Sequence, residues 1–209
     1  MSSNSIVEYC VCTESKNETE ESYCSYCSFV SLLNFNGIEI ERWGTGNAKT
    51  LKHLIKEINN NECVLEEDEN SMLVRLLKVA TAKIYFETNE AKYVLKEEKQ
   101  VFKDGRTRIR TNVSSLTEKM EANEKPKDSI IRGVKEELGI QGELKITTHE
   151  TTSETIYSES YPTLLSQYEI HSFNVYLTEE QFNMNGYKEE QEDKTTYFVW
   201  ITEGDSISV

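Results

Sequence analysis

Two kinds of segment that this sequence lacks exclude several classes of protein. It has no apolar run of about 18 residues, so nothing in it is long enough to span a bilayer as a helix. Its N-terminal sequence, MSSNSIVEYC, has neither a basic start nor an apolar stretch, so we expect no secretory signal. Positive charge is scarce as well, because 23 Lys and Arg face 37 Asp and Glu for a net charge of −14. Such a protein repels nucleic acid and anionic membranes, and we expect neither as a partner.

The cysteines do not form an even set. There are five of them and no export signal, which indicates a reduced, cytoplasmic protein rather than a disulfide framework. A four-thiolate zinc site could be built from Cys10, Cys12, Cys24 and Cys27. The Cys-x-Cys pair is an unusual zinc spacing, however, so we favour free thiols over zinc. We expect Cys63 to be a lone thiol that is buried or partly buried.

The composition divides the chain into three parts. Residues 1–28 form a polar segment that contains most of the cysteines, and residues 29–70 form an extension with a strand predicted over 29–40 and a short helix over 48–58. Residues 71–209 form the main domain, in which strand-like runs stand on both sides of a helix predicted over 126–138. Strands around one central helix predict an α/β fold with a mixed sheet.

The predicted helix carries two adjacent carboxylates. Positions 133, 136 and 137 share one side of it, because residues three and four apart are neighbours on a helix. Glu136 and Glu137 could therefore share Mg²⁺ or Mn²⁺, which prefer oxygen ligands. The alternative is a solvated helix face, which is what most Glu pairs form.

The segment around this helix resembles the Nudix motif, G-x5-E-x7-R-E-U-x-E-E-x-G-U, in which U is aliphatic. The matching positions are Glu124, Arg132, Val134, Glu136, Glu137, Gly139 and Ile140. Leu116, Lys119 and Glu121 also match the sequence that usually leads into the motif. Two positions depart from it, since Glu118 stands at the leading glycine and Gly133 stands where a Glu should follow Arg132. Together with the stretch DGRTRIR, the Arg-Gly pair resembles a eukaryotic branch of Nudix-like proteins.

The resemblance implies a fold and a role for each matching residue. The fold would be a Nudix-type α/β/α sandwich with a mixed sheet, preceded by the N-terminal extension. Arg132 and Glu124 would form an ion pair that ties the loop to the helix. Glu137 would be a metal ligand, and Glu136 a second ligand or an aid in activating water.

The carboxylate that the motif places at position 133 is absent, and a glycine there weakens the helix by about 1 kcal/mol relative to alanine. A carboxylate from elsewhere could replace it. The candidates are Glu118, Glu121 and the acidic segment 189–193, for which a solvated charge run is the alternative.

Three of the six arginines lie close together. Arg106, Arg108 and Arg110 alternate along a predicted strand, which places them on one face. Guanidinium groups bind phosphate oxygens well, so these residues are candidates for holding a substrate phosphate. The alternative is cross-strand pairing with Glu97 and Glu98.

Two functions remain open on this evidence. The first is a metal-dependent Nudix-type pyrophosphohydrolase that acts on a nucleoside diphosphate linked to another moiety, and the retained carboxylates favour it. The second is a catalytically impaired Nudix-like domain that binds a nucleotide or a protein partner as a sensor or scaffold. Gly133 favours this second function.

Overall fold

The computed structural model describes residues 25–109 and 115–203. Cys10, Cys12, Cys24 and Arg110 therefore lie outside the described residues. No helix of the described part is long and apolar enough to cross a membrane. The elements are α1 (Ser25–Phe35), the 3-10 helix η1 (Ile40–Arg42), α2 (Leu51–Asn59), β1 (Val64–Glu67), β2 (Leu73–Glu87), β3 (Lys92–Phe102), β4 (Thr107–Arg108), β5 (Leu116–Lys119), α3 (Pro126–Leu138), β6 (Lys145–Tyr157), β7 (Leu165–Tyr176), β8 (Tyr187–Glu190) and β9 (Lys194–Thr202).

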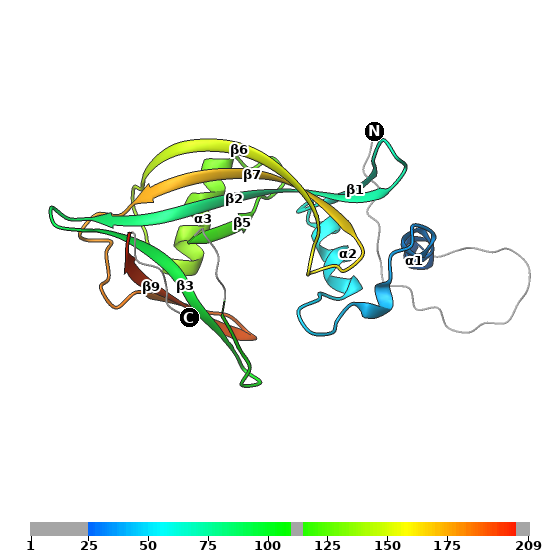
Figure 1. The fold of residues 1–209 in the computed structure, drawn as a ribbon, viewed down its shortest axis with the longest axis horizontal. Coiled ribbons are helices and arrows are strands. Elements are labelled where there is room, and N and C mark those ends of the chain that lie inside the picture. Colours follow the sequence, from blue (N-terminus) through cyan, green and yellow to red (C-terminus); the bar gives the residue numbers. More distant parts are fainter. Residues whose placement is uncertain (1–24, 110–114, 204–209) are drawn as a thin grey trace, which may run out of the picture. The chain divides into compact units, whose positions relative to one another are not determined.

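The strands form one sheet in the order β6-β7-β2-β3-β9-β8, with β1 and β5 paired to β2 and β4 paired to β3. The pairs β2–β3, β2–β5, β3–β9 and β8–β9 are antiparallel. The neighbours β2 and β7 point in the same direction (Figure 1), so the sheet is mixed. The predicted α/β fold with a mixed sheet is thereby confirmed.

The chain folds as two compact units. The first contains the chain up to Leu77 together with Ser153–Tyr168, and the second contains Lys78–Thr152 and the chain from Glu169 onward. The domain limits drawn from composition, after residues 28 and 70, stay predictions. The strand predicted over 29–40 is wrong, because Ser25–Phe35 form helix α1, in which the buried Phe29 and Leu33 stand one turn apart.

A buried ion-pair network lies in the first unit. Arg75 is 2% exposed and donates from Nη2 to Oε2 of Glu57 over 2.7 Å, while Lys49 reaches the other oxygen of that carboxylate. The guanidinium carbon of Arg75 lies 5.0 Å from the ring centre of the fully buried Tyr161. Trp43 donates from its ring nitrogen to the carbonyl of Pro162. These contacts fix residues from the 153–168 segment against the N-terminal helices of the same unit.

Of the two described cysteines, neither of which forms a disulfide, Cys63 is buried in this unit at 3% exposure, as predicted, and Cys27 is half-buried.

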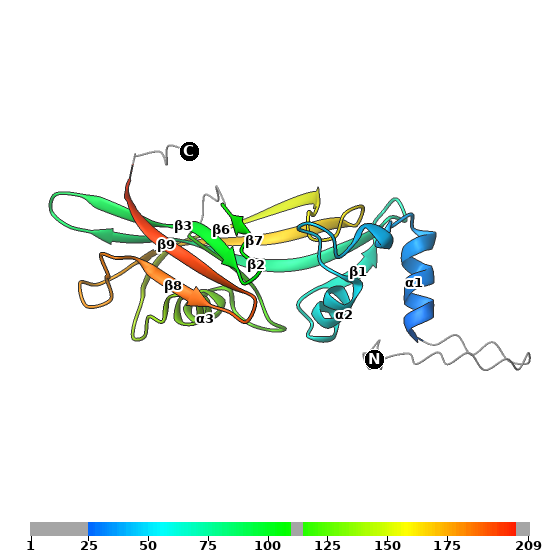
Figure 2. The ribbon, with the colours of Figure 1, turned by 90° about the horizontal axis from the view of Figure 1, so that it is seen from below.

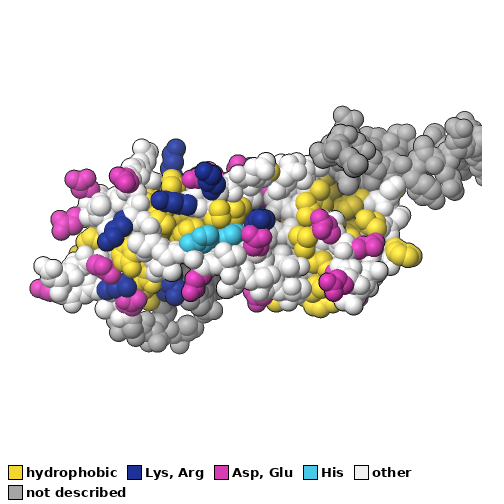
Figure 3. All heavy atoms as spheres, turned by 90° about the horizontal axis from the view of Figure 1, so that it is seen from above, with side chains coloured by type: hydrophobic (Ala, Val, Ile, Leu, Met, Phe, Trp, Pro, Cys, Tyr) yellow, Lys and Arg dark blue, Asp and Glu magenta, His cyan; other side chains and the backbone are white. Residues whose placement is uncertain are grey.

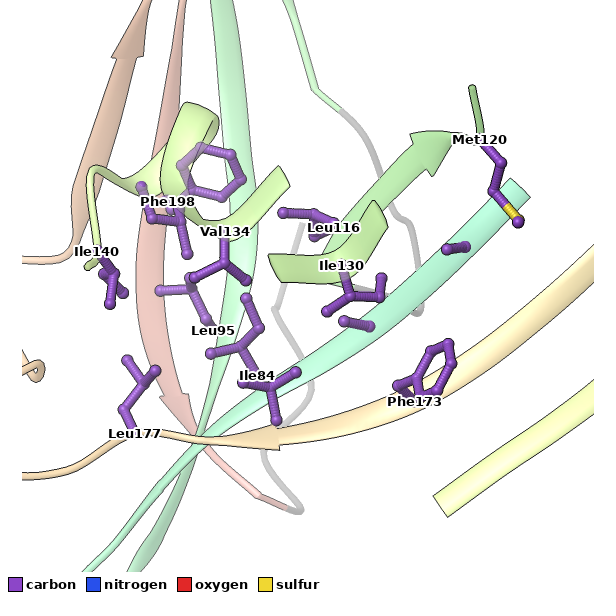
Figure 4. Close-up of a cluster of buried hydrophobic side chains, with 14 residues drawn as sticks. Ile84, Leu95, Leu116, Met120, Ile130, Val134, Ile140, Phe173, Leu177 and Phe198 are labelled. Atoms are coloured by element: carbon purple, nitrogen blue, oxygen red, sulfur yellow. The ribbon is translucent and has the colours of Figure 1, made fainter. Parts of the chain in front are cut away.

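Helix α3 begins and ends where its sequence predicts. Pro126 occupies the first turn, where its missing N–H removes no helical hydrogen bond, and Gly139 caps the other end with a φ of 68°. Ile130 and Val134 are fully buried and point from α3 toward Ile84 and Leu95 of the sheet (Figure 4). Burial of each such side chain contributes about 1.5–3 kcal/mol, so this face holds the helix on the sheet.

The part of α3 that carries Gly133 and Glu137 lies beside this buried face and meets the strands that form the site. Helix α3 contacts β5, which precedes it in the chain, and β8, which lies at the edge of the sheet. Figure 2 shows α3 beside β8 and the crossing strands β3 and β9. The carboxylates at the C-terminal end of the helix therefore meet side chains from several strands.

A hydrogen-bonded histidine pair lies on β6 and β7. Nε2 of His149 is 3.0 Å from Nδ1 of His171, and the other ring nitrogen of His171 is 2.8 Å from Glu169, which also pairs with Lys78. Histidine side chains reach the surface drawn in Figure 3, with acidic and basic groups beside them. Since both ring nitrogens of His171 have protein partners, its observed role is to hold β6 and β7 together.

Candidate functional site

The loop between β5 and α3 is held by one arginine. Arg132 donates from Nε and Nη2 to the two carboxylate oxygens of Glu124 over 3.0 and 3.1 Å, and Nη2 also reaches the carbonyl of Lys119. Glu124 in turn accepts from the backbone N–H of Glu121. The hydrogen bond with Arg132 lowers the pKa of Glu124 below its ordinary value. The structure thus brings the two residues of the predicted ion pair into contact, in a geometry that ties the loop to the helix.

Glu118 occupies the space in front of Gly133. A Cβ atom at position 133 would lie 3.0 Å from both the carboxyl carbon and Oε1 of Glu118, and closer still to its Cγ. Atoms that close would collide, so no other residue fits at position 133 unless Glu118 moves. Oε2 of Glu118 accepts from Nη1 of Arg132 over 3.0 Å, and its side chain is only 15% exposed. The glycine that weakens the helix is therefore the space that admits this carboxylate.

Glu118 lies beside Glu137, the last carboxylate of α3, and each of the two groups shifts the pKa of the other. Burial, together with the adjacent Glu118, raises the pKa of Glu137 to about 9. Burial also raises the pKa of Glu118, although Glu137 and the charge of Arg132 act in the opposite direction. Two carboxylates this close repel each other, so both ionise fully only if positive charge lies beside them.

A small polar cavity lies against Glu137. Its volume is about 160 Å³, and three carboxylates line it, Glu97 from β3, Glu137 from α3 and Glu189 from β8. The negative charges of Glu189 and Glu97 add to the rise in the pKa of Glu137. The remaining lining residues are Gln100, Ser115, Leu116, Thr117, Gln191, Lys194 and Thr196. Lys194 is the one cationic side chain among them, so the cavity is acidic with a single basic contact.

The donor chemistry of this site fits a hard divalent cation. Mg²⁺ and Mn²⁺ take carboxylate oxygens, and Glu137, Glu97 and Glu189 line the cavity while Glu118 lies beside Glu137. No group of three or more His, Cys, Asp or Glu side chains stands ready in metal-binding geometry within residues 25–109 and 115–203. A cation would therefore draw carboxylates of this cavity toward itself on binding.

Two other candidate carboxylates point away from the pair. Glu136 is 58% exposed and bonds to Nη1 of Arg132 over 3.3 Å, so it does not line the cavity. Glu121 is 68% exposed and lies 3.9 Å from Arg132. Of the residues considered for replacing the carboxylate absent at position 133, Glu118 is the one whose side chain fills the space there.

The described arginines do not meet the cavity. Arg106 lies in the turn before β4, where it bonds to Asp104 over 2.7 Å and covers the ring of Phe102. Arg108 is on β4, opposite Gln100. Neither residue lines the cavity. A phosphate-binding role for Arg106, Arg108 and Arg110 stays a prediction.

Sequence reasoning missed two residues of the cavity. Glu97 was assigned only to cross-strand pairing, yet a β-bulge between Glu97 and Lys99 shifts the register of β3 against β9 there. Lys194 begins β9, directly after the acidic segment. That segment was interpreted as a solvated run, but its first residues form β8, and Glu189 faces the cavity while Glu190 is exposed. Side chains alternate between half-buried and exposed along β8, and this alternation distinguishes Glu189 from Glu190.

Comparison with known proteins adds solved structures of low similarity. No protein-family model and no curated protein sequence matches this chain. Structural similarity links it to the Nudix hydrolase RenU from M. smegmatis, with 12% identity, a TM-score of 0.39, and coverage of 67% of this chain and 80% of that one. It also links it to an Ap4A hydrolase from C. elegans, with 15% identity, a TM-score of 0.33, and coverage of 61% and 80%. A third match is the Nudix domain of Shewanella oneidensis NrtR in complex with ADP-ribose, with 9% identity, a TM-score of 0.32, and coverage of 62% and 75%. At such values the function has to be argued from the side chains of this chain.

Proposed function

We propose that this protein is a metal-dependent pyrophosphohydrolase that acts on a nucleoside diphosphate linked to another moiety. The observation that carries the proposal is the convergence of carboxylates on one small cavity. Glu137, Glu97 and Glu189, from α3, β3 and β8 respectively, line the cavity, and Glu118 of β5 lies beside Glu137. Burying so many like charges together destabilises a fold, so such a cluster supports a role in binding a cation.

The cavity residues can divide the work of hydrolysis among them. Glu118 and Glu137 would hold Mg²⁺ or Mn²⁺, which would neutralise the diphosphate and activate water. Lys194 and Glu189 both line the cavity, and in this proposal Lys194 would bind a phosphate oxygen while Glu189 would accept a proton from the attacking water. In the reaction a water oxygen bonds to phosphorus, the anhydride P–O bond breaks, and the leaving phosphate takes the electron pair.

The size of the cavity defines which part of the substrate it holds. A volume of about 160 Å³ accommodates phosphate and a few waters, since each water occupies about 30 Å³ in the liquid. The nucleoside and the second moiety would therefore lie outside the cavity. The NrtR domain mentioned above was crystallised with ADP-ribose, a nucleoside diphosphate linked to a sugar, and we include that compound among the candidate substrates.

A screen of phosphoanhydride substrates tests this function. Dinucleoside polyphosphates, nucleotide sugars and nucleoside triphosphates would be incubated with the protein and Mg²⁺ or Mn²⁺, and the phosphate-containing products identified by chromatography. We expect turnover of a nucleoside diphosphate derivative that EDTA abolishes. Glu189→Gln should reduce turnover strongly, whereas Glu190→Gln should not, because its neighbour Lys188 holds Glu190 on the exposed side of β8.

Two results would contradict the proposal. One is the absence of turnover for every substrate class with either cation. The other is turnover that Glu137→Gln leaves unchanged, since that would place the chemistry elsewhere. A nucleotide that raises the melting temperature without being hydrolysed would support the alternative of a nucleotide-binding sensor.

A further inference from the structure

The two departures from the motif lie in contact with each other. Glu118 replaces the leading glycine, and Gly133 replaces the glutamate that should follow Arg132. In the structure the side chain of Glu118 fills the space where a side chain at position 133 would stand, with its carboxyl carbon 3.0 Å from the expected Cβ position. A glycine and a glutamate have thus exchanged positions, and each accommodates the other.

We propose that Glu118 and Gly133 form one functional unit, in which strand β5 supplies to the metal site the carboxylate that helix α3 lacks. This inference rests on the proposed metal-dependent function. It assigns to Glu118 the role of a metal ligand and to Gly133 that of a positioning residue. Gly133 acts only by leaving space, so any side chain there displaces the carboxylate.

Three observations support this unit. First, Glu118 fills the space at position 133, which lies one helical turn from Glu137 on the same side of α3, so the two carboxyl groups are close enough to share one cation. Second, Arg132 holds Oε2 of Glu118 over 3.0 Å and orients the carboxylate from behind. Third, Glu118 is paired opposite Ala80 in the β5–β2 ladder, which fixes the backbone from which its side chain extends. The position of the Glu118 carboxylate is therefore fixed by the pairing of its backbone with β2 and by the hydrogen bond from Arg132.

The unit also explains why Gly133 does not imply an impaired protein. A helix position without tertiary contacts would tolerate alanine, and the helix would become more stable because alanine has a higher helix propensity than glycine. At position 133 the Cβ of alanine would instead collide with Cγ of Glu118. The Glu118 side chain cannot easily move away, because β5 and Arg132 hold it in place. The glycine is the residue that this arrangement of carboxylates requires.

Manganese binding to single and double variants tests the inference. Mn²⁺ affinity would be measured by isothermal titration calorimetry or by electron paramagnetic resonance, without substrate, for the full chain. We expect Glu118→Gln to weaken Mn²⁺ binding by about tenfold or more, because a ligand is removed. Gly133→Ala should weaken it comparably although no charge is lost. Glu121→Gln, which alters the exposed candidate carboxylate, and the control Glu190→Gln should leave the affinity unchanged.

A double-variant cycle separates the steric contact from the metal. Gly133→Ala should lower the melting temperature in the parent chain but raise it in a Glu118→Ala background, where the space is open. The reciprocal exchange, Glu118→Gly with Gly133→Glu, should restore Mn²⁺ binding that each single substitution loses. This cycle is informative even if one single variant is poorly folded, because the double variants remove the collision.

The outcomes distinguish this inference from the proposed function. If the parent hydrolyses a substrate and binds Mn²⁺, but Glu118→Gln retains the parent's affinity, the inference is overturned and the function stands. If the parent binds Mn²⁺ through Glu118 yet hydrolyses nothing, the inference holds and the function fails. Additive effects of Gly133→Ala and Glu118→Ala on melting temperature would also overturn the inference, because residues in contact should not act independently.

Discussion

Replacing Glu137 with glutamine should stabilise the protein in the absence of divalent cations. The pKa of Glu137 is raised from 4.5 to about 9 by burial and by neighbouring carboxylates. One pKa unit corresponds to about 1.4 kcal/mol. The raised pKa of Glu137 therefore lowers the free energy of unfolding by an amount on the order of 3 kcal/mol at pH 7. Glutamine is neutral and can still donate a hydrogen bond to Glu118, which removes this cost.

The pH dependence has a defined sign. The pKa of Glu137 is higher in the folded state, so the folded protein binds its proton more tightly. Stability from this residue is fully present below pH 4.5 and is lost progressively as the pH rises toward 9. The advantage of Glu137→Gln should therefore be small at pH 5 and large at pH 8.

Thermal unfolding in EDTA measures this advantage. A gain of about 3 kcal/mol corresponds to roughly 6–12 °C for a chain of this length. Glu136→Gln is the matched control, because it removes an exposed carboxylate one position away and should change stability by about 0.5 kcal/mol or less. An equal melting temperature for Glu137→Gln and the parent at pH 8, or a gain that is no smaller at pH 5, would refute the reasoning.

Three further substitutions have expected outcomes. Arg132→Lys should lower stability by about 1–3 kcal/mol in urea denaturation, because lysine cannot reproduce the two-point contact with Glu124. Lys194→Ala should raise KM in hydrolysis assays more than Arg106→Ala does, since Lys194 lines the cavity and Arg106 does not; equal effects would contradict the assignment. Ile130→Ala should lower the free energy of unfolding in urea by about 2–5 kcal/mol, because it leaves a cavity between α3 and the sheet. A loss below about 1 kcal/mol would contradict the place of Ile130 in the core.

Local sequence signals predicted helix α3 and the strands of the main domain well, but they wrongly predicted a strand where residues 25–35 form helix α1. The bounds of α3 follow from Pro126, Gly139 and the spacing of its apolar residues, all of which act within a few turns of chain. The mixed sheet followed from strand-like runs on both sides of this helix. Such signals depend on neighbours in sequence, which is why they are readable without coordinates.

The composition of the site depended on contacts distant in sequence. The sequence shows that positions 118 and 133 are both irregular, but only the pairing of β5 with β2 and the packing of α3 on β5 show that they touch. Likewise, the β-bulge that accompanies Glu97 at the cavity arises where β3 meets β9, roughly a hundred residues later in the chain. The packing of residues 153–168 with the N-terminal helices has no local signal at all.

Hydrolysis by the parent chain and by Glu137→Gln tests the central claim most directly. The measurement is the rate of product formation from a nucleoside diphosphate derivative with saturating Mg²⁺ or Mn²⁺, with thermal unfolding as a check that the variant is folded. We expect cation-dependent turnover by the parent chain. The rate should fall at least about tenfold in Glu137→Gln, although this variant is more stable without metal. Equal turnover by the two proteins, or none by the parent with any such substrate, would contradict the central claim.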